Sequence, residues 1–244
     1  MTEFQEPLFA LRAFGALDLT GTPGAEMVIR QPKRAALLVY LAVARPRGLQ
    51  RRDRLLGLFW PEHSQEHGRA ALRKAVYAIR QALGDDVIGS RGDEELAVDP
   101  SRLTSDAVAF DDAIERGRFA YALELYHGHF LDGFFADAPG FERWADDERT
   151  RYRDEAARAA WSLAERFERE ADLTTATRWA RKVALLAPSD ERAMRRVIQL
   201  LDRAGDRAGA VRAYEEFARR LKADLDIEPS RETRDLVARI RSGA

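Results

Sequence analysis

The sequence has no cysteine, only four histidines and no long apolar run. Without cysteine the protein holds no disulfide, iron–sulfur cluster or thiolate zinc site. No apolar segment reaches the roughly 18 residues that a membrane-spanning helix needs. The N-terminal MTEFQEPLF carries acids where a secretory signal would carry a basic region. We therefore predict a cytoplasmic protein with no membrane contact, no bound metal and no cofactor.

Negative charge is also scarce in one part of the chain. The whole sequence has a net charge of −1, yet residues 27–84 contain twelve basic and three acidic side chains, a net charge of +9. The remainder therefore carries −10. A segment of 58 residues with this excess of positive charge is a candidate site for binding a polyanion.

The first hundred residues alternate between strand and helix patterns. Residues 8–31 contain short apolar runs broken by GTPG, which predicts two or three short antiparallel strands. Helices are predicted from Pro32 to about residue 45, from about Arg51 to Phe59, and over residues 67–84. Residues 86–99 then read as a β-hairpin. Strands, three helices and a terminal hairpin make a winged helix-turn-helix.

Helical periodicity dominates from Ser101 onward, so the domain boundary is predicted near Asp99-Pro100-Ser101. Residues 163–180 and 197–214 align at an offset of 34, which is the tetratricopeptide period. The predicted fold is mainly α with a small β component. A winged helix-turn-helix occupies residues 1–99, and an all-α domain of tetratricopeptide-like repeats occupies residues 100–244.

The segment HGRAALRKAVYAIRQALG, residues 67–84, has no carboxylate. On a helical wheel Leu72, Val76, Ile79 and Leu83 form a core stripe. An adjoining face carries Arg69, Arg73, Tyr77 and Arg80, with Lys74 just beyond. The DNA major groove admits one helix, and arginine and lysine are the side chains that meet guanine edges and phosphates there.

Other basic residues surround this helix. Arg51, Arg52, Lys33 and Arg34 lie at the starts of the two preceding helices, where they would contact the DNA backbone. A solvated charged face, RNA and an acidic protein are the alternative readings of the same pattern. Solvated faces, however, usually mix signs to form i,i+4 pairs.

Three blocks of sequence resemble a known family. RAALLVYLAVARPRGLQRRDRLLGLFWPE, ALRKAVYAIRQALGDDVI and the hairpin ending ELAVDP resemble the OmpR-type winged helix of SARP-type transcriptional activators. FDDAIERGRFAYALELYHGHFLDGF and FERWADDERTRYRDEA, together with the following LLAPSDERAMRRVIQLLDRAGDRAGAVRAYEEFARR, resemble the bacterial transcriptional activator domain that follows it. The resemblance extends from about Leu8 to Ile240.

The resemblance implies a sequence-specific activator that binds direct repeats in promoter DNA, as a homodimer on DNA, and contacts RNA polymerase. It would be cytoplasmic and associated with the nucleoid when bound to DNA. The loop Trp60, Pro61 and Glu62 would face the polymerase. The hairpin tip GDEEL is acidic, and Arg91 is its only cation, which argues against deep insertion of the wing into the minor groove. The predicted DNA-binding residues are Arg69, Arg73, Lys74, Tyr77, Arg80, Arg51, Arg52, Lys33, Arg34 and Arg91.

Two rival functions come from other classes. HSQEH, residues 63–67, matches a zinc-protease signature, but no third ligand is suggested. No phosphate loop or catalytic triad can be argued from the sequence, so we predict that the protein is not an enzyme. The alternative reading is a helical-repeat interaction scaffold whose winged helix does not bind DNA.

Overall fold

The computed structural model describes residues 8–21 and 23–243, and the chain divides into two compact units. Unit 1 comprises the segment up to Arg116 together with Glu124–Tyr152, and unit 2 comprises Gly117–Leu123 together with the segment from Arg153 onward. Residues 1–7, where we predict no secretory signal, lie outside the described residues. Among the described helices, none combines the length and apolar character needed to cross a bilayer.

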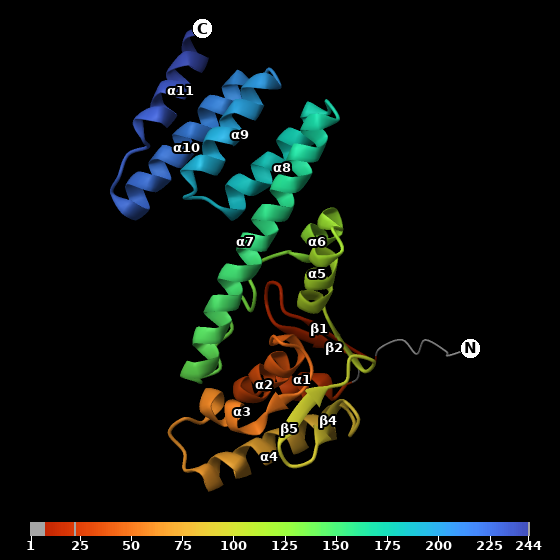
Figure 1. Ribbon diagram of the computed structural model, residues 1–244. Coiled ribbons are helices and arrows are strands. Elements are labelled where there is room, and N and C mark those ends of the chain that lie inside the picture. The colour runs from red at the N-terminus through yellow and green to blue at the C-terminus, as the bar shows by residue number, and fades with distance from the viewer. Residues whose placement is uncertain (1–7, 22, 244) are drawn as a thin grey trace, which may run out of the picture. The chain divides into compact units, whose positions relative to one another are not determined.

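Unit 1 begins with a small sheet (Figure 1). Strands β1 (Phe9–Arg12) and β2 (Asp18–Thr20) are antiparallel, as predicted, and β6 (Leu103–Ser105) pairs with β1 in parallel. The third strand allowed by the sequence pattern is instead helix α1 (Ala25–Ile29). A Cβ on Gly24, just before α1, would lie 2.4 Å from the carbonyl oxygen of Ala82. Packing this close to another helix outweighs the β propensity of a short apolar run.

The three predicted helices follow. They are α2 (Pro32–Val43), α3 (Arg52–Phe59) and α4 (Gln65–Leu83). Strand β3 (Gln50–Arg51) joins the hairpin β4 (Ile88–Arg91) and β5 (Glu95–Val98) in an antiparallel sheet of order β3-β5-β4. The predicted core stripe of α4 is confirmed: Leu72, Val76, Ile79 and Leu83 are all buried.

A continuous aromatic core fills unit 1. Phe14 packs edge-on against Phe110, Tyr126, Phe130 and Tyr152, with ring centroids 5.0–6.4 Å apart. Phe14 lies just after β1, and Phe110 lies on α5 (Asp106–Glu115). Tyr126 and Phe130 follow α6 (Phe119–Leu125), and Tyr152 lies in the first half of α7 (Pro139–Arg169). Residues beyond 99 thus share the core of the winged part. The boundary near residue 99, as a boundary between functions, stays a prediction.

The buried carboxylate of Asp111 ties three segments of unit 1 together. Its side chain has no exposed surface, and it contacts Arg45 at 2.6 Å, Arg151 at 2.9 Å and Arg47 at 3.3 Å. Arg45 and Arg47 precede β3, Asp111 lies on α5 and Arg151 on α7. The hydroxyl of Tyr152 donates to the same carboxylate at 3.4 Å. Burial alone would lower the pKa of Arg151, but Tyr152 and the carboxylates of Glu148 and Asp111 outweigh it and raise the pKa.

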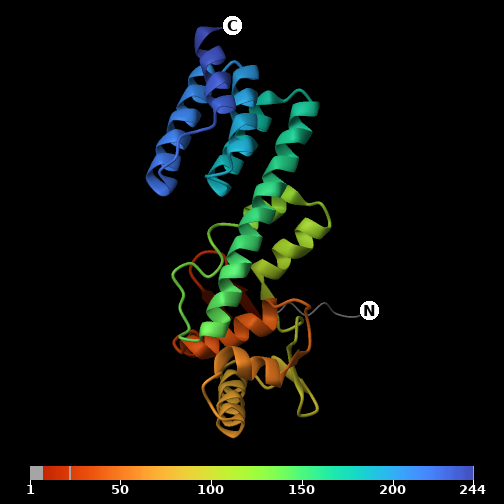
Figure 2. The ribbon, with the colours of Figure 1, turned by 60° about the vertical axis from the view of Figure 1, so that its left-hand side comes forward.

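Unit 2 is a stack of helices in which the predicted repeat is visible (Figures 1 and 2). The second half of α7 is followed by α8 (Leu173–Leu186), α9 (Glu191–Arg203), α10 (Arg207–Leu225) and α11 (Arg231–Ser242). Asp172 caps α8 and Asp206 caps α10, each through its side chain and 34 residues apart. The residues before them, Ala171 and Gly205, both have positive φ. The 34-residue period is therefore confirmed down to the geometry of its turns.

We predict that Asp111→Ala destabilises the protein by about 3–5 kcal/mol, because it leaves several guanidinium groups facing a buried space without their carboxylate. Urea denaturation followed by circular dichroism measures this. Asp112→Ala is the matched control: Asp112 accepts from Arg47 at 2.6 Å but is partly exposed, so it should cost about 1 kcal/mol or less. Equal effects of the two substitutions would contradict the central role of Asp111.

Candidate nucleic-acid interface

The exposed side of α4 presents basic residues and a tyrosine. Arg69, Arg73, Lys74 and Tyr77 are exposed, and Tyr77 as a whole residue retains 64% of its accessible surface. The opposite side of α4 is buried in unit 1. An exposed tyrosine between cations gives this surface both donors for phosphates and a flat ring for contact with bases or sugars. Figure 2 looks nearly along α4, with the hairpin beside it.

Helix α4 begins two residues earlier than the sequence pattern predicts. The side chain of Ser64 caps the helix by accepting from the backbone N–H of His67. Glu66 therefore lies in the first turn, and α4 contains one carboxylate after all. A negative charge in the first turn is favoured by the helix dipole, so it does not interrupt the basic surface further along.

Arg80 is hydrogen-bonded to the wing, the hairpin formed by β4 and β5. Its Nε and one terminal nitrogen donate to the carbonyl oxygen of Ile88 at 3.0 and 2.6 Å, and that terminal nitrogen also donates to the Ser90 hydroxyl at 3.1 Å. Arg80 is accordingly only half exposed. The structure thus separates Arg80 from the other predicted groove residues, because its guanidinium already joins α4 to β4.

Arg52 lies where α3, α4 and the wing meet. Its backbone N–H donates to the carbonyl oxygen of Glu94 at 2.8 Å. Burial lowers the pKa of the Arg52 guanidinium, and the positive charges of Arg80 and Arg73 add to this, while Asp93 and Glu94 oppose it. The structure therefore brings three of the predicted DNA-binding arginines together, and it places the acidic wing tip beside them.

The remaining predicted cations have different environments. Asp53 lies 3.8 Å from Arg51 and 3.7 Å from Arg69, so one exposed carboxylate accompanies two of them. On the wing, Arg91 donates to Glu95 at 2.6 Å across the hairpin. Lys33 and Arg34 are half exposed in the first turn of α2. Arg34 donates to the carbonyl oxygen of Met27 at 3.3 Å.

The loop between α3 and α4 combines a buried residue with exposed ones. Trp60 retains only 8% of its surface and packs against Phe59 with ring centroids 5.7 Å apart, whereas Pro61 and Glu62 are exposed. The end of α3, just before this loop, lies beside the start of α7, because a Cβ on Gly140 would lie 2.7 Å from the carbonyl oxygen of Leu58. Trp60 therefore anchors the loop, and only Pro61 and Glu62 are presented.

Sequence reasoning missed Asp53 and Ser64 as parts of this site. Asp53 lies between Arg52 and Arg54 in the sequence, where nothing local indicates its contacts with Arg51 and Arg69. Serine favours helix caps, and Ser64 lies three residues before the predicted start of the helix at His67. In the described part of the chain, no three histidine or acidic side chains are grouped as metal ligands would be, HSQEH included.

The model of the bacterial transcriptional activator domain matches residues 93–241. The chain belongs to this family. Membership indicates a regulator of transcription. A search of curated proteins gave no match.

The family fold recurs among solved structures. EmbR of Mycobacterium tuberculosis, solved in complex with a low-affinity phosphopeptide, matches with a TM-score of 0.62 and 21% identity over 98% of this chain. The match spans 66% of EmbR, just under two thirds of its length, and shows the fold alone. A de novo designed helical repeat protein, DHR64, covers 88% of this chain and 93% of its own at 19% identity, with a TM-score of 0.29, too low to support a conclusion.

We predict that Arg80→Ala loosens the wing and destabilises unit 1 by about 1–3 kcal/mol, the range for hydrogen bonds made by charged groups. Hydrogen exchange should show faster exchange in β4 and β5, and the urea midpoint should fall. Arg73→Ala serves as the control, because Arg73 is exposed, and its melt should match that of the wild type. Unchanged exchange in β4 and β5 of Arg80→Ala would contradict this structural role.

Proposed function

We propose that the chain is a sequence-specific DNA-binding activator of transcription that places α4 in the major groove of promoter DNA. The observation that carries the proposal is the exposed side of α4. Beyond its first turn, that side carries Arg69, Arg73, Lys74 and Tyr77 and no carboxylate, while its apolar stripe is fixed in the core. Membership of the activator-domain family supports the same conclusion.

The environments of the cations suggest a division of roles. Arg73 and Tyr77 meet base edges from the middle of α4, whereas Lys74 and Arg69 contact phosphates. Arg51, Arg52, Lys33 and Arg34 hold the flanking backbone. Arg80 acts by positioning the hairpin. The wing follows the DNA backbone without entering the minor groove, because Asp93 and Glu94 are exposed at its tip and Arg91 is paired with Glu95.

Binding to direct repeats would place two copies side by side on one face of the DNA, as a homodimer that forms there. Pro61 and Glu62 are presented by the loop before α4 and serve as the contact with RNA polymerase, with Trp60 as their anchor. The protein works in the cytoplasm on the nucleoid. It needs no cofactor and catalyses no reaction.

We predict that Arg73→Ala weakens binding to a selected promoter site by about 1–3 kcal/mol, because a bidentate contact with a base is lost. Lys74→Ala should weaken binding to all sequences alike and reduce the salt slope of the logarithm of affinity by about 1. Mobility-shift titrations over a series of salt concentrations measure both effects, on fragments selected from genomic DNA with the wild-type chain.

The matched control is Arg143→Ala, an exposed arginine on α7 in the same unit. Its affinity and salt slope should equal those of the wild type. Failure of the wild type to enrich any fragment would favour the alternative function, a helical-repeat scaffold whose winged helix does not bind DNA. If Arg143→Ala weakened binding as much as Arg73→Ala, binding would depend on the overall charge of the protein and not on α4.

We predict that Glu62→Ala lowers activated transcription in a purified system several-fold while promoter binding stays unchanged. The reason is that Glu62 is exposed beside the anchored Trp60 and lies outside the basic side of α4. Run-off transcription and mobility shifts on the same template separate the two effects. His63→Ala, the next exposed residue, is the control. If Glu62→Ala activated transcription normally, the proposed contact of this loop with RNA polymerase would be wrong.

A further inference from the structure

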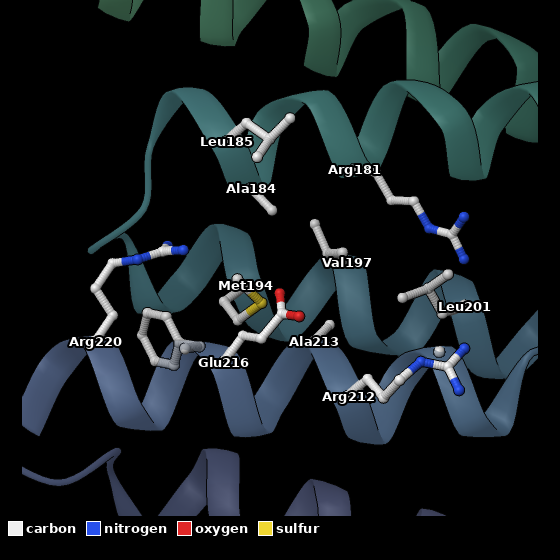
Figure 3. Close-up of a pocket in the computed structure, with 12 residues that line it drawn as sticks. Arg181, Ala184, Leu185, Met194, Val197, Leu201, Arg212, Ala213, Glu216 and Arg220 are labelled. Carbon is white, nitrogen blue, oxygen red and sulfur yellow. The ribbon is translucent and has the colours of Figure 1, made fainter.

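A groove runs across three helices of unit 2 (Figure 3). It encloses about 400 Å³ between α8, α9 and α10. Its lining is largely apolar: Ala184 and Leu185 come from α8, Met194 and Val197 from α9, and Ala213 from α10. Leu185 retains 73% of its surface and is the most exposed apolar side chain of the lining. Met194 and Val197 are buried and form the floor of the groove, whereas Leu185 and the half-exposed Ala184 and Ala213 supply its open apolar surface.

Positive charge lies at both ends of this groove. In Figure 3, Arg220 stands at one end, and Arg181 and Arg212 stand toward the other, with Glu216 between them. Asp206 accepts from Arg181 at 2.7 Å and also caps α10, so the charge of Arg181 is already paired within the protein. Arg212 is 4.0 Å from the same carboxylate and 66% exposed. Arg220 donates to the carbonyl oxygen of Pro188, a neutral partner.

The lining also restricts the backbone of any occupant. Among the described residues that form the groove, none carries an amide or a hydroxyl side chain. Of the described lining residues, Glu216 has the one carboxylate that could accept, so an extended peptide would leave most of its N–H groups unpaired, whereas a helix satisfies them internally. Arg212 and Arg220 are eight residues apart on α10, a rise of about 12 Å. Two carboxylates eight residues apart on a bound helix span the same distance.

We propose that this groove binds an acidic amphipathic helix of a partner protein. Apolar side chains of that helix cover Leu185 and the half-exposed Ala184 and Ala213 beside it, and its carboxylates meet Arg212 at one end and Arg220 at the other. The inference uses unit 2 alone and does not depend on DNA binding by α4. The regulator would thus have a second macromolecular partner, recognised by charge and by an apolar stripe.

The test uses the full chain and a fluorescein-labelled helical peptide of about 16 residues, long enough for a leucine stripe flanked by two glutamates eight residues apart. Fluorescence anisotropy should show saturable binding that weakens as salt is raised. Leu185→Ala and Arg212→Ala should each weaken binding about fivefold or more, as expected for losses near 1 kcal/mol. Both side chains are largely exposed, and circular dichroism should show unchanged folding.

The matched control is Arg219→Ala, an exposed arginine on α10 that does not line the groove. It should bind the peptide as the wild type does, and a peptide with lysines in place of the glutamates should not bind. The proposal is overturned by no saturable binding, by equal binding of the lysine peptide, or by equal effects of Arg212→Ala and Arg219→Ala. It is also overturned if light scattering shows a dimer that Leu185→Asp dissociates, since a second copy would then cover the groove.

Discussion

The carboxylate of Asp111 is the contact on which the architecture of unit 1 depends. Three guanidinium groups from two distant segments converge on one fully buried side chain. Charges removed from water are tolerated only when they are paired and hydrogen-bonded, so none of these partners can leave without cost to the others. The turn before β3, helix α5 and helix α7 are held together in consequence.

The basic surface of unit 1 separates into residues with structural duties and residues that remain exposed. Arg45, Arg47 and Arg80 contribute to the positive charge of residues 27–84, yet their guanidinium groups are occupied inside the protein. Arg73, Lys74 and Tyr77 remain exposed on α4. The basic residues of this segment therefore serve three purposes: pairing with Asp111, holding the hairpin through Arg80, and forming the surface proposed to meet DNA.

The same turn geometry occurs twice in unit 2. The turns before α8 and α10 share an aspartate cap and a residue with positive φ, filled by Ala171 in one and Gly205 in the other. Stacked hairpins of this kind bury a shared core and leave a surface across several helices. Here that surface has an apolar floor and arginines at both ends, which is the chemistry from which we infer a helical acidic partner.

Features that depend on local periodicity could be predicted from the order of residues alone. These include helices α2, α3 and α4, the stripe Leu72, Val76, Ile79 and Leu83, the hairpin, and the 34-residue repeat. Which charges meet follows only from the folded arrangement, because residues as distant as Arg45, Asp111 and Arg151 carry no local signal of their contact. Tertiary structure also turned an apolar run into α1, paired β6 with β1, and directed Arg80 to the wing. Each of these depends on packing between segments that no sequence window contains.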